Sequence, residues 1–305
     1  MGELMDDLEA LATRLTSSPD YRVLRRLDPG YAGGPKIRGG NVRRAAIVDV
    51  ETTGLDSEAD QIIELGVVVF EYGAATGQVG AVVGRYSGLE DPGRPIPPES
   101  TAIHHITDEM VSGKRLDDEA IVELLHGVGL VIAHNASFDR AFMEARLPFF
   151  EGFHWACSIR DIAWRDQGYG SSALEFLSYR TGFFYDAHRA ETDCLALLRV
   201  LAGPLGDSGT PALHALLESA RQTSYRVAAL GSPFDSKDAL KARGYRWNSE
   251  DKIWVGDIGA ADRETELAWL KKAVYEGKSV EVEIETLTAK QRYSDREGKK
   301  ERVRI

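Results

Sequence analysis

The sequence is poor in cysteine: Cys157 and Cys194 are the only two among 305 residues, and their spacing matches no structural metal site. Each is expected to pack as a small apolar side chain, and a reducing compartment fits this low content. The sequence also lacks a run of about 18 apolar residues, so no segment is expected to span a membrane. Its start, Met1-Gly2-Glu3, matches neither a signal peptide nor a myristoylation site. We therefore expect a cytoplasmic protein.

Positive charge is the second shortage. Lys and Arg total 37 against 48 Asp and Glu, which leaves a net charge of −11. This balance argues against a generic nucleic-acid coat protein, but not against an enzyme that acts on nucleic acid through bound cations. The charge is also uneven, because residues 226–305 carry 17 basic and 15 acidic side chains whereas residues 1–225 carry 20 and 33. The difference marks a domain boundary near residue 225.

The remaining composition, 43% apolar and 28% charged, is that of a globular protein with one large or two ordinary domains. Leucines at helical spacing in residues 3–16 predict an amphipathic helix, and the glycine- and proline-rich residues 29–40 predict a flexible linker. Strands are then predicted at residues 45–50, 61–72, 79–87, 130–133 and 154–159, with helices at 136–147, 172–181 and 190–202. The four prolines of residues 90–98 predict an ordered loop. This order of elements predicts an α/β fold with a mixed sheet flanked by helices.

Five segments follow from these patterns. They are an N-terminal helix and linker (1–40), a main domain (41–205), a helical linker (206–224), a small α+β domain (225–285) and a basic tail (286–305).

Two acids stand at the end of the first predicted strand, in Ile47-Val48-Asp49-Val50-Glu51-Thr52-Thr53-Gly54-Leu55. Residues i and i+2 of a strand share a face, so the carboxylates of Asp49 and Glu51 are expected to lie close together. Two such carboxylates repel each other unless a proton or a cation lies between them, and a hard divalent cation is the usual solution. Alternatively, the pair is a solvated strand end.

Two further acids lie on predicted apolar helix faces. Asp139 shares a stripe with Phe138 and Phe142, and Asp193 shares one with Leu197. An acid on an apolar face is costly unless it is paired or bound to a cation, so a cluster of four carboxylates is one interpretation; a helix cap or a buried ion pair is the other. His188 can serve the same site only from a loop ahead of the last helix, because five residues of helix would turn it away from Asp193.

Together these residues form a recognisable series. Asp49-x-Glu51-Thr52-Thr53-Gly54, His134-Asn135-x-x-Phe138-Asp139 and His188-x-x-x-x-Asp193 resemble, in this order, the motifs of the DEDDh family of 3′–5′ exonucleases. The best-known members of that family are proofreading subunits of bacterial replicative polymerases. The segment His104-His105-Ile106-Thr107-Asp108 is also similar to the family, and the resemblance covers about residues 44–203.

The resemblance implies a ribonuclease-H-like fold and an exonuclease domain at residues 41–205. It implies that Asp49, Glu51, Asp139 and Asp193 hold two Mg²⁺ or Mn²⁺ ions, which stabilise the attacking and leaving oxygens of an in-line displacement. His188 would deprotonate the attacking water.

The resemblance also implies contacts with the terminal nucleotide. They fall on Thr52, Thr53, Gly54, Leu55, His104, Asn135 and Phe138. Leu55 would wedge against the last base, and Gly54 would let the backbone turn closely. Asn135 and Phe138 would wall the nucleotide slot, and His104 would line the strand channel unless its role is structural. Glu64 is assigned a structural hydrogen-bonding role, and Trp155-Ala156-Cys157-Ser158 departs from the Asp-Thr common in the family.

The C-terminal residues predict a separate β-α-β-α unit. Basic residues alternate there with aromatic ones in Arg243-Gly244-Tyr245-Arg246-Trp247 and in Lys252-Ile253-Trp254, which predicts a platform where bases stack; alternatively, the tryptophans are core residues. Residues 286–305 carry seven basic and three acidic side chains and are expected to be a mobile tail.

These patterns favour a metal-dependent 3′–5′ exonuclease that acts on single-stranded or frayed DNA 3′ ends. An exoribonuclease acting on short RNA remains an alternative, because no motif reads the 2′-hydroxyl. A catalytically silent nucleic-acid-binding module is a third hypothesis, and the five intact motif residues argue against it. The expected partners are a single-stranded DNA 3′ end and a DNA polymerase or another nucleic-acid enzyme, with no membrane.

Overall fold

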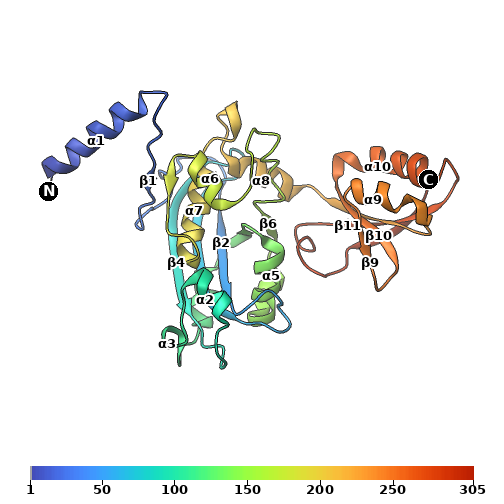
Figure 1. Ribbon diagram of the computed structural model, residues 1–305, viewed down its shortest axis with the longest axis horizontal. Coiled ribbons are helices and arrows are strands. Elements are labelled where there is room, and N and C mark those ends of the chain that lie inside the picture. Colours follow the sequence, from blue (N-terminus) through green and yellow to red (C-terminus); the bar gives the residue numbers. More distant parts are fainter. Residues whose placement is uncertain (1) are drawn as a thin grey trace. The chain divides into compact units, whose positions relative to one another are not determined.

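The computed structural model describes residues 2–305, with side chains from Asp7 onward. Contacts divide it into two compact units (Figure 1). The first comprises the chain up to Phe153 together with Cys157–Leu216, and the second comprises His154–Ala156 and Leu217–Ile305. Each unit has its own sheet.

The elements up to residue 221 begin with a helix, four strands and three further helices, and strands and helices alternate from β5 onward. The strands are β1 (Arg25–Arg26), β2 (Val42–Thr52), β3 (Ile62–Gly73), β4 (Val79–Leu89), β5 (Val128–Ala133), β6 (Trp155–Cys157) and β7 (Phe183–Phe184). The helices are α1 (Gly2–Thr16), α2 (Pro98–His104), α3 (Asp108–Val111), α4 (Asp118–Leu124), α5 (Ala136–Arg146), α6 (Leu174–Arg180), α7 (Ala190–Ala202) and α8 (Ala212–Arg221). Two 3-10 helices are η1 (Pro148–Gly152) and η2 (Gly206–Ser208).

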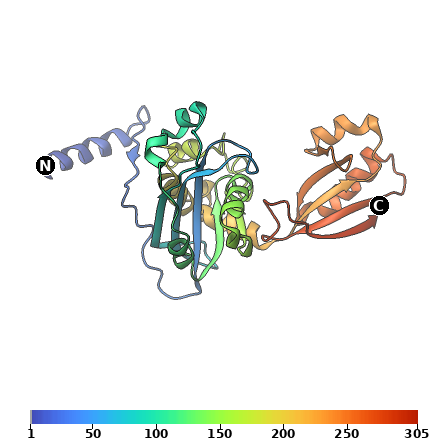
Figure 2. The same ribbon diagram turned by 90° about the horizontal axis from the view of Figure 1, so that it is seen from below.

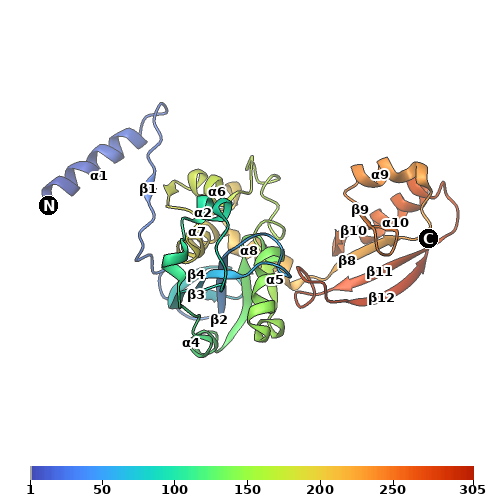
Figure 3. The ribbon, with the colours of Figure 1, turned by 60° about the horizontal axis from the view of Figure 1, so that its bottom comes forward.

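The main sheet has the strand order β4-β3-β2-β5-β6 (Figure 3). The pairs β2–β3 and β3–β4 are antiparallel and β2–β5 is parallel. Residues 45–48 of β2 and 62–70 of β3 are buried, because helices cover this part of the sheet. The expected mixed sheet flanked by helices, of the ribonuclease-H-like kind, is confirmed.

Helix α7 packs on β2, β3 and β4, and Gly66 lets it approach closely. A Cβ atom at Gly66 would lie only 2.4 Å from the backbone carbon of Ala190 and 2.5 Å from the nitrogen of Glu191. Gly66 pairs directly with Asp49 across the β2–β3 ladder. The missing side chain therefore brings the first turn of α7 over the strand that carries the acidic pair.

The second unit is built on an antiparallel sheet with the order β12-β11-β8-β10-β9. Its strands are β8 (Ser224–Ala229), β9 (Arg246–Asn248), β10 (Ile253–Gly259), β11 (Glu281–Leu287) and β12 (Lys299–Arg304). Its helices are η3 (Phe234–Ser236), α9 (Lys237–Ala242), η4 (Ala260–Asp262), α10 (Arg263–Trp269) and a π-helical turn, η5 (Leu270–Val274). Helices α9 and α10 lie on the same side of the sheet (Figure 2), and Leu240, Leu267 and Leu270 pack there with Val227 and Ile284.

One expectation for the first unit is wrong. Residues 30–35 are not a flexible linker: the Gly34 N–H donates to the Gly80 carbonyl at 2.8 Å, and the Val82 N–H donates to the Ala32 carbonyl at 2.8 Å. This segment thereby satisfies the outer edge of β4, whose backbone groups need partners. The loop expected at residues 90–98 forms up to Pro97, and α2 begins at Pro98, because proline can start a helix without losing a hydrogen bond.

The helix expected in residues 206–224 forms as α8, which buries Leu213 and Leu216 completely. One expectation beyond residue 285 is wrong. The basic tail is not mobile: Lys299–Arg304 forms β12, which pairs with β11. Glutamates of β11 face basic residues of β12, with Arg302 near Glu283 and Arg304 near Glu281, so the charges order the strand by cross-strand pairing.

The N-terminal helix forms as expected over Gly2–Thr16. Its described leucines, Leu8, Leu11 and Leu15, are exposed, and Glu9 pairs with Arg25 at 2.7 Å. None of the helices in residues 2–305 combines the length and apolar character that crossing a membrane requires.

Replacing Gly66 with alanine tests the close crossing of α7 and β3. Because the added Cβ meets backbone rather than a movable side chain, Gly66→Ala should lower the free energy of unfolding by about 1–3 kcal/mol. Gly129→Ala in β5 is the matched control, since its Cβ would have no neighbour within 4 Å. Urea unfolding followed by circular dichroism measures both. Equal effects of the two substitutions would contradict the close crossing.

Candidate active site

The acidic pair stands where β2 leaves the core of the sheet. Val48 and Val50 are buried on either side of Asp49, and Asp49 and Glu51 face Gly66 and Glu64 of β3. The β2–β3 register shifts between Glu51 and Thr52. Such an irregularity turns the strand and re-aims its side chains, so both carboxylates are presented at this end of β2.

The crossing of α7 adds a third acid to this pair. One oxygen each of Asp49, Glu51 and Asp193 lies within 4.8 Å of the others. All three are half-buried, and no cationic side chain is among them. Three carboxylate oxygens at such separations are the ligands that a hard divalent cation prefers. The donor set therefore fits a divalent metal ion.

Asp139 lies beside this group but is engaged differently. Its side chain is only 4% exposed, and its Oδ1 accepts a hydrogen bond from the Val50 N–H at 3.2 Å. Helix α5 is thereby tied to the backbone between the two acids of β2. Asp139 is not part of the group within 4.8 Å, although its charge acts on Asp49.

The pKa values of all four acids show the cost of this crowding. Burial, followed by the charges of Asp139, Asp193 and Glu51, raises the pKa of Asp49 well above its usual value. Burial and neighbouring carboxylates raise the pKa of Glu51 to about 8. Burial is also the main cause that raises the pKa of Asp139 to about 7 and that of Asp193 to about 6. Without a counter-charge, the cluster holds protons near neutral pH.

His188 lies on the loop before α7, as expected from the sequence. It is exposed, and its φ of 64° is in the left-handed region, which is uncommon for a residue with a side chain. The Arg189 N–H donates to Oδ2 of Asp193 at 3.0 Å. The backbone next to His188 is thus bound directly to an acid of the cluster.

Glu64 fixes the start of α7 from the opposite strand. It is buried, accepts from Nη2 of Arg189 at 2.7 Å and accepts from the Ala190 N–H at 3.1 Å. A carboxylate at a helix N-terminus satisfies unpaired N–H groups and complements the helix dipole. These bonds agree with the structural role expected for Glu64. Its carboxylate pairs with Arg189 and is not one of the three acids within 4.8 Å of one another.

The Tyr185 hydroxyl donates to Oδ1 of Asp193 at 3.0 Å. Asp193 therefore has one donor on each oxygen, and its carboxylate is held in one orientation. Hydrogen bonds of this kind orient metal-binding carboxylates and tune their affinity.

The residues of the loop after β2 that are expected to contact the nucleotide differ in their exposure to solvent. Leu55 is 86% exposed, whereas the side chains of Thr52 and Thr53 are buried. The Thr52 hydroxyl donates to the Gly54 carbonyl at 2.5 Å, and the Thr53 hydroxyl donates to Oδ1 of Asp60 at 3.0 Å. Both hydroxyls are thus used to fold the loop, and a contact of Thr52 or Thr53 with the terminal nucleotide stays a prediction.

The other residues expected to contact the nucleotide also differ in their exposure to solvent. Asn135 is exposed at the start of α5, and Phe138 is half-buried with its ring 4.8 Å from that of Phe142. His104 is 2% exposed, and its Nδ1 accepts from the Ile106 N–H at 3.0 Å. The structural alternative therefore holds for His104. His134 is half-buried beside Ser158, with Nδ1 and Oγ 2.7 Å apart, and desolvation lowers its pKa to about 4.

Sequence reasoning missed several residues that shape the site: Tyr185, Arg189, Asp60, Arg94 and Ser100. Tyr185 and Arg189 flank the motif histidine, but nothing in their spacing indicates a partner. Asp60 and Arg94 meet only because the loops after β2 and β4 converge, with Nη2 and Oδ1 2.9 Å apart.

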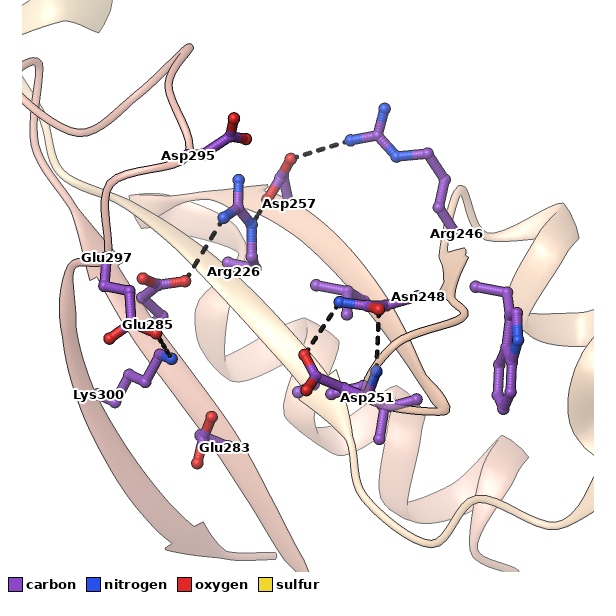
Figure 4. Close-up of a pocket in the computed structure, with 14 residues that line it drawn as sticks. Arg226, Arg246, Asn248, Asp251, Asp257, Glu283, Glu285, Asp295, Glu297 and Lys300 are labelled. Carbon is purple, nitrogen blue, oxygen red and sulfur yellow. Dashed lines mark hydrogen bonds and ion pairs between the residues drawn. The ribbon is translucent and has the colours of Figure 1, made fainter. Parts of the chain in front are cut away.

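The second unit has a cavity of about 380 Å³ on the sheet face opposite α9 and α10. Figure 4 shows Arg226 between Asp257 and Glu285, with Nε 3.0 Å from Asp257 and Nη1 3.5 Å from Glu285. The charged lining consists of Arg226, Arg246, Lys300, Asp251, Asp257, Glu283, Glu285, Asp295 and Glu297. Acids outnumber bases here, so the cavity repels phosphate.

The expected base-stacking platform is largely absent. Tyr245 and Trp254 belong to the core beneath α9 and α10, which leaves Trp247, 51% exposed, as the accessible ring. Arg243 pairs with Glu266 at 2.8 Å and Arg246 pairs with Asp257 at 3.2 Å. Basic and aromatic residues alternate along this stretch of the sequence. In the folded unit, however, two of its three aromatic side chains, Tyr245 and Trp254, are buried in the core.

Comparisons with known proteins agree on one family. The family model RNase T, described as exonuclease, matches residues 46–201, just over half of the 305-residue chain. DNA polymerase III subunit epsilon of Treponema pallidum is 32% identical over 165 residues, which cover 50% of this chain and 74% of that protein. Exodeoxyribonuclease 10 of Escherichia coli is 32% identical over 168 residues, which cover 53% and 69%. DNA polymerase III PolC-type of Thermotoga maritima is 37% identical over 111 residues, 36% of this chain but only 8% of that protein.

The raised pKa values predict that the metal-free protein loses stability as pH rises. The folded state keeps protons on Glu51, Asp139 and Asp193 up to pKa values of about 8, 7 and 6, whereas their usual values are 4.5, 3.8 and 3.8. The contribution of these three groups to the free energy of unfolding should therefore be greatest below about pH 4. It should fall between about pH 4 and pH 8. Each excess proton contributes about 1.4 kcal/mol per pH unit, which corresponds to about 3–6 °C in Tm per pH unit.

Thermal unfolding in a chelator from pH 5 to pH 8.5 measures this dependence. Asp139→Asn, which keeps an oxygen for the Val50 N–H, should flatten it, and Mn²⁺ should raise Tm more at pH 8 than at pH 5.5. A Tm that stays constant across this range in the wild-type protein would show that the carboxylates are not crowded.

Proposed function

The chain belongs to the RNase T exonuclease family, and on that premise we propose that it is a 3′–5′ exodeoxyribonuclease that removes nucleoside monophosphates from single-stranded or frayed DNA ends. The observation that carries the proposal is the group of Asp49, Glu51 and Asp193, whose oxygens lie within 4.8 Å of one another. Exodeoxyribonuclease 10, among the relatives, supports DNA as the substrate.

Asp49, Glu51 and Asp193 would hold Mg²⁺ or Mn²⁺, with Asp139 completing a site for two ions. Bound divalent ions supply Lewis-acid stabilisation of the charge that develops on the phosphate oxygens. The chain itself contributes the preorganised carboxylates: Tyr185 and the Arg189 N–H fix Asp193, and Asp139 fixes the backbone between Asp49 and Glu51.

His188 would act as the general base. It takes a proton from the attacking water, the new bond forms to phosphorus, and the bond to the 3′ oxygen of the shortened strand breaks. The exposed loop position gives this side chain access to water, while the Glu64–Arg189 ion pair fixes the next residue. A positioned base of this kind contributes about 10²–10⁴ to the rate.

The terminal nucleotide would meet Leu55, Asn135 and Phe138. Leu55 is the exposed apolar side chain nearest in sequence to Glu51, and it would press against the face of the last base. Thr52, Thr53 and Gly54 would act through the shape of the loop, because the threonine hydroxyls are already bonded within it.

A DNA polymerase is the partner that the similarity to an epsilon subunit suggests. Its contact surface on this chain would lie outside the acidic group. A pull-down with the replicative polymerase of the same organism would test this partner.

Degradation of labelled strands tests the function directly. With 5′-labelled single-stranded DNA and RNA of one sequence, DNA should shorten stepwise from its 3′ end in Mg²⁺ or Mn²⁺ and stay intact in chelator. His188→Ala and Asp193→Asn should each slow this by about 10²-fold or more, because each removes a chemical group that the transition state needs.

Asp186→Asn is the matched control. Asp186 is an exposed acid on the same loop that pairs with Arg26, so its loss should leave the rate unchanged. If RNA shortens faster than DNA, the proposed substrate would be RNA and not DNA. A mobility shift with no shortening of either polymer would mean a catalytically silent binding module and would overturn the proposal.

Removing one hydroxyl tests how Asp193 is held. Tyr185→Phe keeps the ring but loses the donor to Oδ1, so Mn²⁺ affinity should fall by about 10-fold. Isothermal titration with Mn²⁺ measures this without turnover. Tyr21→Phe, at an exposed tyrosine, is the control, and equal affinities of the two variants would rule out the orienting role.

A further inference from the structure

The loop that carries Leu55 is held by hydrogen bonds to one carboxylate, that of Asp60. Oδ1 of Asp60 accepts from the Thr53 hydroxyl at 3.0 Å, and Oδ2 accepts from the Asp56 N–H at 3.1 Å. Asp60 thus holds the residues on both sides of Gly54-Leu55. With both of its oxygens bonded inside the loop, this acid has a role separate from that of the acidic group on β2.

Gly54 shows how closely the loop is folded onto this acid. A Cβ atom there would lie 2.3 Å from Oδ2 and 2.7 Å from Oδ1 of Asp60. The backbone of Gly54 therefore lies directly against the carboxylate, and only the absence of a side chain permits it.

Arg94 and Ser100 complete the brace from a second loop and from α2. Nη2 of Arg94 donates to the Thr53 hydroxyl at 2.8 Å and to Oδ1 of Asp60 at 2.9 Å. The Ser100 hydroxyl donates to the Thr53 carbonyl at 2.9 Å. Thr53 is consequently buried, with both its hydroxyl and its carbonyl engaged.

Leu55 itself is 86% exposed and has no comparable support of its own. A single exposed leucine is ordinary on a protein surface, but here it stands on a backbone that is bonded on both sides. A rigid apolar side chain can hold a base away from its neighbour, whereas a mobile one loses this effect to conformational entropy.

We propose that Asp60, together with Arg94, is a positioning residue that keeps Leu55 rigid against the terminal base, and that this brace sets how well the enzyme opens a paired 3′ end. The inference rests on the exonuclease function proposed above. It concerns the paired end in particular, because a single strand presents its terminal nucleotide without unpairing.

Steady-state kinetics on a blunt duplex and on a single strand of the same sequence test the brace. Asp60→Asn should lower kcat/KM on the duplex by about 10-fold through kcat, with a much smaller effect on the single strand. Leu55→Ala should reproduce this pattern. If Asp60 acts through Leu55, adding Asp60→Asn to Leu55→Ala should change nothing further, as a double-mutant cycle requires.

Arg94→Gln is the second variant, since this half-exposed side chain can be replaced without opening the core. It should show the same loss on the duplex even if Asp60→Asn folds poorly. Glu58→Gln, an exposed acid of the same turn, is the control that should leave both rates unchanged.

Equal losses on both substrates, or a full effect of Asp60→Asn in the Leu55→Ala background, would overturn the positioning role. Failure of the proposed function would look different, because the wild-type protein would then degrade neither substrate. Mn²⁺ affinity of Asp60→Asn should match that of the wild-type protein, and a weakened affinity would assign Asp60 to the metal site instead.

Discussion

Repulsion among half-buried carboxylates is the constraint on which the rest of the first unit depends. Asp49, Glu51 and Asp193 cannot lie this close in a poorly solvated place unless surrounding bonds hold them there. The Arg189 N–H and the Tyr185 hydroxyl bind Asp193, and the Val50 N–H, between Asp49 and Glu51, donates to Asp139. The fold thereby stores an unfavourable electrostatic arrangement that a divalent cation relieves, which is how an acidic site acquires affinity for metal before substrate arrives.

The same framework separates the acids whose oxygens lie within 4.8 Å of one another from acids that hold the structure. Glu64 faces Glu51 across the β2–β3 ladder, yet Arg189 and the N-terminus of α7 neutralise it. Asp60 follows Glu51 by nine residues, yet the Thr53 hydroxyl, the Asp56 N–H and Arg94 use both of its oxygens. Residue type is identical in these cases, and the partners alone decide the role.

The second unit has a different electrostatic character. Its net charge by sequence is slightly positive, but the cross-strand pairs of β11 and β12 consume the basic residues, and the described cavity has an excess of acids. Local charge therefore cannot be read from the balance of a segment. Its aromatic residues show the same effect, because α9 and α10 cover Tyr245 and Trp254 while leaving Trp247 half-exposed.

The sequence by itself determined the mixed sheet, the strand that carries Asp49 and Glu51, the helices that carry Asp139 and Asp193, and the loop position of His188, because strand and helix periodicities are local properties of the chain. It also determined the family through motifs in a fixed order. Only the tertiary structure decided which hydroxyls and acids are already bonded, how residues 30–35 and the C-terminal strand satisfy sheet edges, and which residues brace Leu55. These outcomes depend on contacts between residues far apart in sequence, such as Asp60 with Arg94 and Gly66 with Ala190, which no local pattern encodes.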